Sequence, residues 1–340
     1  MFLIVGWASI GFSLTNARGD ATSRDPKVRK SIDAGLRYLA GSQSRGGQWL
    51  ADGGTYPVAM TALAGTAILL DGNTTIQGKY AKQIESAVGF LIDQSQPNGL
   101  IGDPQRDTRY MYGHGFSMLF LSEVLGEEED PARRTKLVDV LHRAVEFAGQ
   151  AQTPDGGWGY VSARDGNGFD EGSVTVTQMQ GLRACRNAGI AVPRTIISRG
   201  ISYIERCTDA EGGVRYSLKT PGGPRPPITA AAIVCLFNAG EYQNPLVGRL
   251  IAYAEKTLGP ATAQQSFGHW QYAQYYYAQV VYRQGDEAWK RYADKIHNVI
   301  IDQQAPDGSW NEGYIGAVYT TSLNLTILQL DNGYLPIYQR

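Results

Sequence analysis

Two neighbouring carboxylates and one histidine are the side chains in this sequence best suited to acid–base chemistry. Asp170 and Glu171 are adjacent, and Ser173 and Thr175 follow them closely. A carboxyl group removed from water holds its proton more tightly and can exchange it with a bound molecule. His114 lies between two glycines and is a further candidate, since imidazole titrates near neutral pH. We therefore take Asp170, Glu171 and His114 as candidate catalytic residues.

The same side chains also have structural interpretations. Asp and Ser are favoured helix N-caps, so residues 170–175 would serve as a capping cluster at the start of a buried helix. His114 would satisfy a turn or a helix end. Adjacent residues on a loop often point apart, so Asp170 and Glu171 act as a pair only if the loop directs them to one side. The sequence leaves both interpretations open.

Composition and spacing exclude several classes of site. Lys and Arg number 31 against 32 Asp and Glu, a formal net charge of −1. This balance gives no electrostatic reason to expect nucleic acid as a partner. The three cysteines form no C-x-x-C pair, and the four histidines are scattered without metal-ligand spacing. We therefore expect no metal ion and no cofactor.

A turn motif of glutamine, glycine and often tryptophan recurs along the chain. It occurs, for example, at 43–49, 152–158 and 304–310. Self-similarity at a period of tens of residues is typical of repeat architectures, in which each unit is one supersecondary element. The tryptophans belong to these turns, so we expect them to brace each turn against the next outer helix rather than to bind a ligand.

Each repeat contains two helices of different character. The first helix of each pair is amphipathic and charged, at 27–39, 79–92, 133–147, 194–205, 245–255 and 287–300. The second is nearly free of charge, at 58–70, 115–125, 174–184, 228–238, 271–282 and 317–330. A helix that is apolar on all sides must be buried on all sides. The pattern predicts an all-α fold, an α6/α6 toroid built from six helical hairpins with the uncharged helices inside.

The N-terminus carries a separate signal. Residues 2–14 form an apolar run of 13 residues, shorter than the ~20 that span a membrane, and small residues follow it. This favours a signal peptide over 1–17 and one toroid domain over 18–340. We expect export to the periplasm or the medium, with membrane association through this segment as the alternative.

Parallel inner helices would bring their N-termini to one rim of the toroid. The positive ends of the helix dipoles would then face a common space and favour an anionic or carbonyl group. The residues expected to bind a ligand there are Arg109, Tyr112, Ser173, Thr175, Thr229, Tyr272, Tyr276 and Tyr319. Tyrosine offers a broad apolar face with a polar tip.

The glutamine–glycine–tryptophan segments resemble the repeats of squalene and oxidosqualene cyclases and of protein prenyltransferase β subunits. The resemblance covers roughly residues 27–335 and implies an α/α toroid. Squalene-hopene cyclases carry an acidic D-x-D-D-T-A motif, which 169–175 resembles. Thr175 matches its threonine, whereas Ser173 and Val174 stand at its two central aspartates. Residues 111–116 and 334–340 resemble a bacterial, exported branch of prenyltransferase and squalene-oxidase repeat proteins.

The resemblance implies a central cavity that binds an apolar, isoprenoid-like molecule. Catalysis of the terpenoid-cyclase type, an isomerase reaction, stays open because the acidic motif is not intact. The zinc of prenyltransferases is not expected, since no Asp-x-Cys begins an inner helix. Two alternatives remain: a non-catalytic exported module that binds a protein partner or acts as a scaffold, and a carbohydrate-active toroid with paired carboxylates.

Overall fold

The computed structural model describes residues 25–166, 168–259 and 269–339, and the predicted signal peptide at 1–17 lies outside these ranges. The described residues form twelve α-helices and no β-strand. One set is α1 (Pro26–Ser42), α3 (Ala81–Asp93), α5 (Pro131–Ala151), α7 (Arg194–Cys207), α9 (Pro245–Leu258) and α11 (Asp286–Asp302). The other is α2 (Pro57–Leu69), α4 (Tyr110–Glu127), α6 (Gly172–Asn187), α8 (Pro226–Ala239), α10 (Trp270–Arg283) and α12 (Ala317–Gln329).

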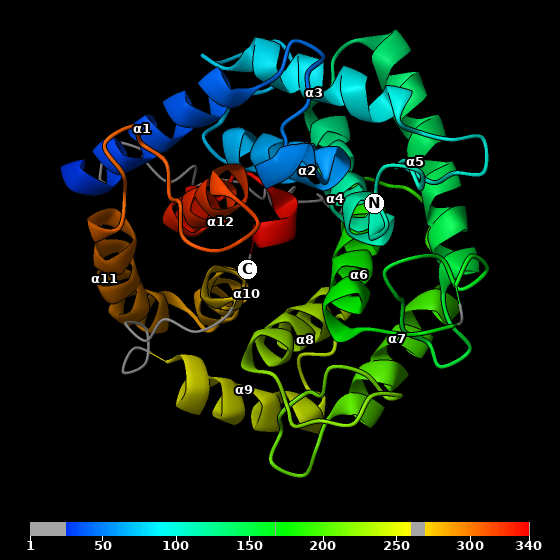
Figure 1. Cartoon of the computed structure of the whole chain (residues 1–340). Coiled ribbons are helices and arrows are strands. Elements are labelled where there is room, and N and C mark those ends of the chain that lie inside the picture. The colour runs from blue at the N-terminus through cyan, green and yellow to red at the C-terminus, as the bar shows by residue number, and fades with distance from the viewer. Residues whose placement is uncertain (1–24, 167, 260–268, 340) are drawn as a thin grey trace, which may run out of the picture.

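The two sets form concentric rings (Figure 1). Each even-numbered helix packs against the next around the inner ring, and α12 packs against α2 to close it. The odd-numbered helices lie outside and cover the inner ones. The all-α toroid predicted from the alternation of charged and uncharged helices is confirmed.

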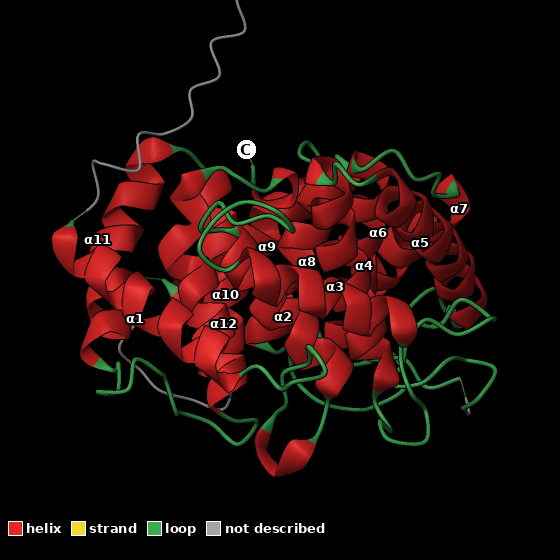
Figure 2. Ribbon diagram, turned by 90° about the horizontal axis from the view of Figure 1, so that it is seen from above, coloured by secondary structure: helices red, strands yellow, loops and turns green. Residues whose placement is uncertain are grey.

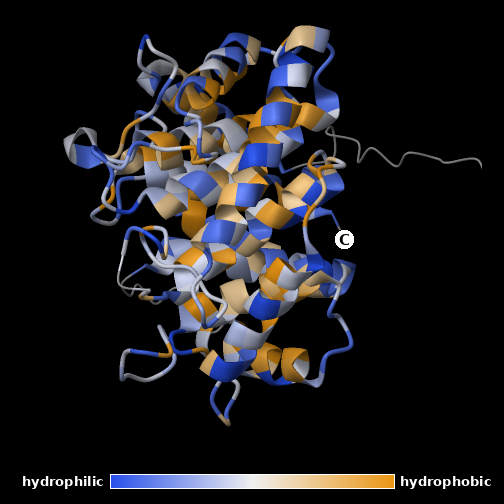
Figure 3. Ribbon diagram, turned by 90° about the vertical axis from the view of Figure 1, so that its right-hand side faces the viewer, coloured by the Kyte–Doolittle hydropathy of each residue, from blue (hydrophilic) through white to orange (hydrophobic). Residues whose placement is uncertain are grey.

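The burial of each helix follows from its composition. In α2 every residue from Val58 to Leu69 is buried, whereas α7 buries only one face, made of Ile196, Gly200, Tyr203, Ile204 and Cys207. Figure 3 shows blue and orange segments alternating along the peripheral helices. An amphipathic helix packs one stripe inward, and a uniformly apolar helix needs neighbours on all sides. No described helix is both long and apolar enough to cross a lipid bilayer.

The two edges of the toroid differ. Long connections enter the inner helices at one edge, and the chain ends at the other, where short connections lead to the outer helices (Figure 2). All inner helices therefore begin at the edge of the long connections, as the sequence predicts. We call this edge the N-terminal rim.

Hydrogen bonds from the recurrent turns tie neighbouring helices together. The indole Nε1 of Trp158 donates to the carbonyl of Ala148 on α5 at 2.8 Å, and its backbone N–H donates to Thr175 Oγ1 on α6 at 3.0 Å. Gln152 Nε2 donates to the carbonyl of Ile196 on α7 at 3.0 Å. One turn thus joins three helices. The indole N–H binds the preceding outer helix, and the glutamine reaches the next one. The predicted contact of tryptophan with the next outer helix is confirmed at Trp310, whose ring packs so closely against Gly35 on α1 that a Cβ there would lie 2.9 Å from it.

The same bonds recur at the point where the ring closes. Trp310 Nε1 donates to the carbonyl of Ile300 on α11 at 2.6 Å, and its backbone N–H donates to Thr321 Oγ1 at 3.1 Å. Gln304 Nε2 donates to the carbonyl of Ser31 on α1 at 3.0 Å. The last turn therefore holds the first helix, so the toroid is closed by the contact that joins its repeats.

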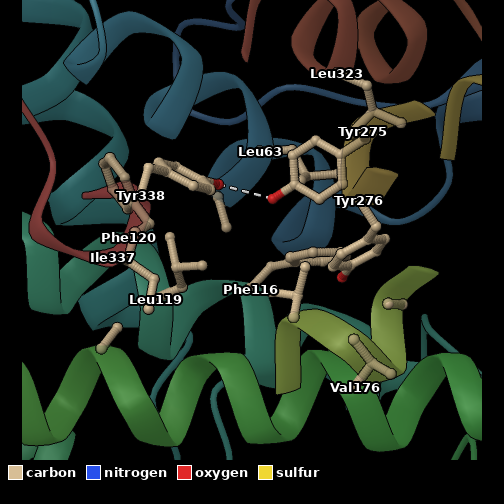
Figure 4. Packing of buried hydrophobic residues seen from close by; sticks show 14 of the residues in the cluster. Leu63, Phe116, Leu119, Phe120, Val176, Tyr275, Tyr276, Leu323, Ile337 and Tyr338 are labelled. Carbon is tan, nitrogen blue, oxygen red and sulfur yellow. Dashed lines mark hydrogen bonds between the residues drawn. The ribbon is translucent and has the colours of Figure 1, made fainter. Parts of the chain in front are cut away.

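Buried aromatic side chains meet in the middle of the ring (Figure 4). The hydroxyls of Tyr275 on α10 and Tyr338 in the C-terminal segment lie 2.7 Å apart, and the ring of Tyr276 packs edge-on to Tyr275. Gln180 Nε2 on α6 donates to Gln279 Oε1 on α10 at 3.0 Å, across the inner ring. The C-terminal segment packs on α4 and α6. Side chains from opposite helices therefore contact one another below the N-terminal rim.

The turn geometry predicts that Gly156→Ala destabilises the protein more than Gly189→Ala. Both glycines have positive φ, 92° and 86°, so alanine costs about 1–2 kcal/mol of backbone strain at either site. A Cβ at Gly156 would lie 2.4 Å from the carbonyl oxygen of Arg199, whereas one at Gly189 meets nothing within 4 Å. Overpacking adds about 1–3 kcal/mol at Gly156 alone. Chemical denaturation of both variants measures the difference, and equal losses would contradict the turn contact.

Candidate functional site

A hydrogen-bonded carboxylate cluster lies at the N-terminal rim, at the start of α6. Glu171 is the N-cap of this helix and its Oε2 accepts from the backbone N–H of Val174 at 2.8 Å. Ser173 Oγ lies 2.7 Å from both carboxylate oxygens of Glu171 and 2.5 Å from the hydroxyl of Tyr112 on α4. The Tyr112 hydroxyl also lies 3.3 Å from Glu171 Oε2. We call Tyr112, Glu171 and Ser173 the rim cluster.

Burial sets the protonation of the rim cluster. Glu171 is only 1% exposed. Loss of water raises its pKa, although hydrogen bonds from Ser173, Val174 and Tyr112 to the ionised form oppose the shift. Burial, followed by the nearby Glu171 charge, raises the pKa of Tyr112 well above its ordinary value. Tyr112 is therefore a neutral hydrogen-bond donor, and Glu171 holds its proton more tightly than a solvated carboxyl group.

Tyrosine rings surround the rim cluster on the side of α10 and α12. The hydroxyl of Tyr272 donates to the carbonyl oxygen of Ser173 at 3.4 Å. The rings of Tyr272 and Tyr276 meet edge to face with centroids 4.8 Å apart. Burial is the largest cause of the raised pKa of Tyr272, and the side chain of Tyr319, on α12, is among the nearby groups that raise it further. The structure thus brings together Tyr112, Glu171, Ser173, Tyr272, Tyr276 and Tyr319 from four inner helices and their caps.

Arg109 extends the site to the surface of the rim. Its guanidinium lies 4.6 Å from the ring centroid of Tyr160, a cation–π contact. Tyr160 shares a hydrogen bond with the hydroxyl of Tyr216, and its ring lies 5.9 Å from that of Tyr112. Sequence reasoning missed Tyr160 and Tyr216 because it searched helix starts, whereas these residues lie in the long connections. The sequence signal that could have found them is a tyrosine in each of the long connections that lead into α6 and α8.

The structure does not bring His114 to the rim cluster. His114 is fully buried between α4 and α5, and its ring packs edge-on to Phe147. Its Nδ1 accepts from the backbone N–H of Ile101 at 3.1 Å, so the proton lies on Nε2, which donates to the carbonyl of Ala144 at 3.1 Å. Burial lowers the pKa of this imidazole to about 4. A neutral ring with both nitrogens bound to backbone fits the structural interpretation.

Asp170 also faces other partners than its neighbour Glu171. It is fully buried, and its Oδ1 accepts from the hydroxyl of Tyr203 on α7 at 2.7 Å. The same oxygen accepts from Ser217 Oγ at 2.9 Å and from the N–H of Leu218 at 3.2 Å. Asp170 therefore links the connection before α8 to α7 of the outer ring by hydrogen bonds. It does not form a carboxylate pair with Glu171.

The two candidate threonines are engaged in the turns. Thr175 Oγ1 accepts from the N–H of Trp158 and donates to the carbonyl of Glu171 at 2.9 Å. Thr229 Oγ1 accepts from the N–H of Val214 at 2.9 Å and donates to its own helix. Both side chains are fully buried, so neither presents its hydroxyl to the rim. In the described ranges, no three His, Cys, Asp or Glu side chains cluster as a metal site would require.

Comparison with known proteins shows the fold. No protein-family model matches the chain, and the search of curated proteins found no significant relative. Among solved structures, the type II terpene cyclase MstE from Scytonema is 15% identical, with a TM-score of 0.62, and the match covers 91% of this chain and 99% of that one. A variant of this cyclase in complex with its substrate, geranylgeranyl dihydroxybenzoate, matches with a TM-score of 0.61 and 14% identity.

Other toroid enzymes match as well. An α-1,6-mannanase of Salegentibacter, in complex with α-1,6-mannotriose, is 7% identical with a TM-score of 0.64, covering 90% of this chain and 99% of that one. At such identities the likeness shows the fold alone. The chain has a terpenoid-cyclase-like α/α toroid fold, as the resemblance in its repeats implies.

The raised pKa of Glu171 predicts a pH-dependent stability that Glu171→Gln removes. A carboxyl group that binds its proton more tightly when folded stabilises the fold at low pH. This stabilisation is lost as pH rises from the ordinary value near 4.5 through the raised one. The free energy of unfolding of the wild type should therefore fall over this range relative to Glu171→Gln, measured by urea denaturation at several pH values. Glu146→Gln, at an exposed position, is the control, and parallel profiles for wild type and Glu171→Gln would contradict the burial effect.

Proposed function

We propose that this toroid binds an isoprenoid-like molecule at its N-terminal rim. The polar group of the ligand would bond to the rim cluster, and its apolar chain would lie against the rings of Tyr272, Tyr276 and Tyr319. The observation that carries the proposal is the buried Glu171 carboxyl, hydrogen-bonded to Ser173 and Tyr112 beside these rings. A small number of polar groups surrounded by aromatic side chains is typical of sites that bind small molecules.

Structural neighbours support this class of ligand. MstE, with the same toroid fold, is a terpene cyclase whose variant binds geranylgeranyl dihydroxybenzoate, an isoprenoid chain attached to a polar ring. In this chain, the tyrosine rings would contact such an apolar chain, while Arg109 and the positive ends of the inner helices would attract a phenol or carboxylate.

The chemistry open to Glu171 is proton exchange with an oxygen atom. Protonation of an isolated alkene needs a strong acid, and a carboxyl group with a raised pKa is a weaker acid than usual. Ser173 stands at the position where squalene-hopene cyclases carry an aspartate. We therefore propose Glu171 as a proton donor or acceptor for a phenol, carboxylate or carbonyl of the ligand, and do not extend the proposal to alkene cyclisation.

One observation favours a second candidate, a non-catalytic interaction module. Tyr275, Tyr276 and Tyr338 pack together in the middle of the ring, which limits the depth available to a ligand. Such a toroid would bind a protein partner on its surface. The carbohydrate-active alternative needs two carboxylates facing one space, and the divergent partners of Asp170 and Glu171 do not favour it. Export through the apolar run at 2–14 remains part of the proposal and is tested by N-terminal sequencing of the mature protein.

The first experiment is mass spectrometry of organic extracts from the purified protein, followed by titration with geranylgeranyl dihydroxybenzoate. We expect a co-purifying apolar molecule and saturable binding, detected by tyrosine and tryptophan fluorescence. Glu171→Ala should weaken binding about fivefold, because a lost hydrogen bond in a buried site costs about 1 kcal/mol. Glu146→Ala, at an exposed site, should bind like the wild type.

Extracts that match a blank, together with no binding of the probe by folded protein, would refute the ligand-binding proposal and favour the interaction module. Binding of equal strength by wild type and Glu171→Ala would retain a ligand but reject the rim cluster as its site.

A further inference from the structure

A pocket lies between α6, α7 and α8, at the edge opposite the N-terminal rim. Its volume is about 350 Å³. Arg183 and Arg186 line it from the last turns of α6, and Arg194 lines it from the first turn of α7. At 1.5 Å per residue, Arg186 lies about 20 Å along α6 from Glu171. The pocket is therefore separate from the rim cluster.

The positive charge of this pocket is not neutralised by the protein. Across the described ranges, none of the three arginines forms an ion pair with a carboxylate. One acidic residue, Glu241, is among those that line the pocket. Three guanidinium groups around one space, with a single carboxylate nearby, attract an anion.

A buried amide that lines the pocket has one polar group without a partner. Asn238 on α8 lines the pocket and is only 6% exposed. Arg283 Nη2 donates to its Oδ1 at 3.3 Å, which fixes the orientation of the amide, so the group left without a partner is the donor Nδ2. A buried donor without an acceptor is energetically unfavourable, because it has lost its hydrogen bonds to water. The pocket thus supplies hydrogen-bond donors that an anionic ligand would satisfy.

Helix dipoles account for part of the charge but not all of it. Arg183 and Arg186 lie near the C-terminus of α6, where a positive side chain is favourable. Arg194 is the first residue of α7, and this helix has no side-chain cap. A positive charge at a helix N-terminus is unfavourable, because the helix dipole is positive there. An anion held between Arg194 and α6 would remove this repulsion.

The remaining lining is apolar. The pocket includes Met179, Leu182, Val192, Ile197 and Ile201. We propose that this pocket binds a medium-chain anionic amphiphile. Its carboxylate or phosphate would lie among the three arginines and Asn238 Nδ2, and its alkyl chain would cover the apolar side chains. A volume of about 350 Å³ accommodates about a dozen heavy atoms at ~30 Å³ each. This site is additional to the proposed rim site and does not depend on it.

Calorimetric titration of the whole protein with decanoate and with decyl phosphate tests the proposal and distinguishes the two head groups. Decanol tests binding of the alkyl chain without an anionic head group, and inorganic phosphate tests binding of the head group without the chain. We expect at least one of the two amphiphiles to bind with 1:1 stoichiometry, at least tenfold more tightly than decanol or phosphate. The double variant Arg186→Gln/Arg194→Gln should weaken it at least tenfold, and Arg249→Gln, on the exposed face of α9, should not.

Asn238→Asp places a carboxylate where the free donor was, and should abolish binding. Arg186 and Arg194 are exposed, so their double variant decides the question even if Asn238→Asp fails to fold. Equal affinity for decanol and decanoate, or unchanged affinity in the double arginine variant, would overturn the proposal. Glu171→Ala should leave this binding unchanged, so failure of the rim site and failure of this pocket are distinguishable.

Discussion

The hydrogen bonds of the glutamine–glycine–tryptophan turns hold the rings of this protein together. In the turns at 43–49, 152–158 and 304–310 the indole binds the preceding outer helix, the glutamine binds the next one, and the backbone N–H of the tryptophan binds a threonine of the inner helix. The bonds are directional and largely buried, so breaking one leaves donors without acceptors. Since the last turn binds Ser31 of α1, the contact that adds a repeat also closes the ring.

This construction has a consequence for chemistry at the rim. Because each turn leads into an inner helix, all inner helices begin at the same edge, and their positive dipole ends lie there. Glu171 caps one of these helices and bonds to Ser173, while the hydroxyl of Tyr112 reaches it from the neighbouring helix. A carboxyl group at such a position would ordinarily be ionised. Its burial works in the opposite direction and raises its pKa, which is the basis for the proton exchange proposed for this group.

The opposite edge has a different character. Its connections are short, and the C-terminal segment packs into the ring, where Tyr338 bonds to Tyr275. The arginines at the end of α6 and the start of α7 surround a pocket with an apolar lining. The site proposed at one edge is rich in tyrosine, with Arg109 at its surface, and the site proposed at the other edge is lined by three arginines. The two would select different ligands, because the first offers hydrogen bonds to an oxygen atom beside tyrosine rings, whereas the second concentrates positive charge beside an aliphatic lining.

The sequence by itself determined the all-α toroid, the assignment of helices to the outer and inner rings, and the edge at which the inner helices begin. These follow from charge periodicity and helix connection alone. It also named Glu171, Ser173, Tyr112 and Tyr272 as candidates, and the structure places these four residues in contact. Only the tertiary structure decided which candidates share a site. The carboxylate of Asp170 bonds to Tyr203. His114 accepts a hydrogen bond from the backbone N–H of the turn before its helix, as Thr175 does in the turn before α6. Residue type and spacing specify what a side chain can bond to, whereas its direction depends on partners distant in sequence.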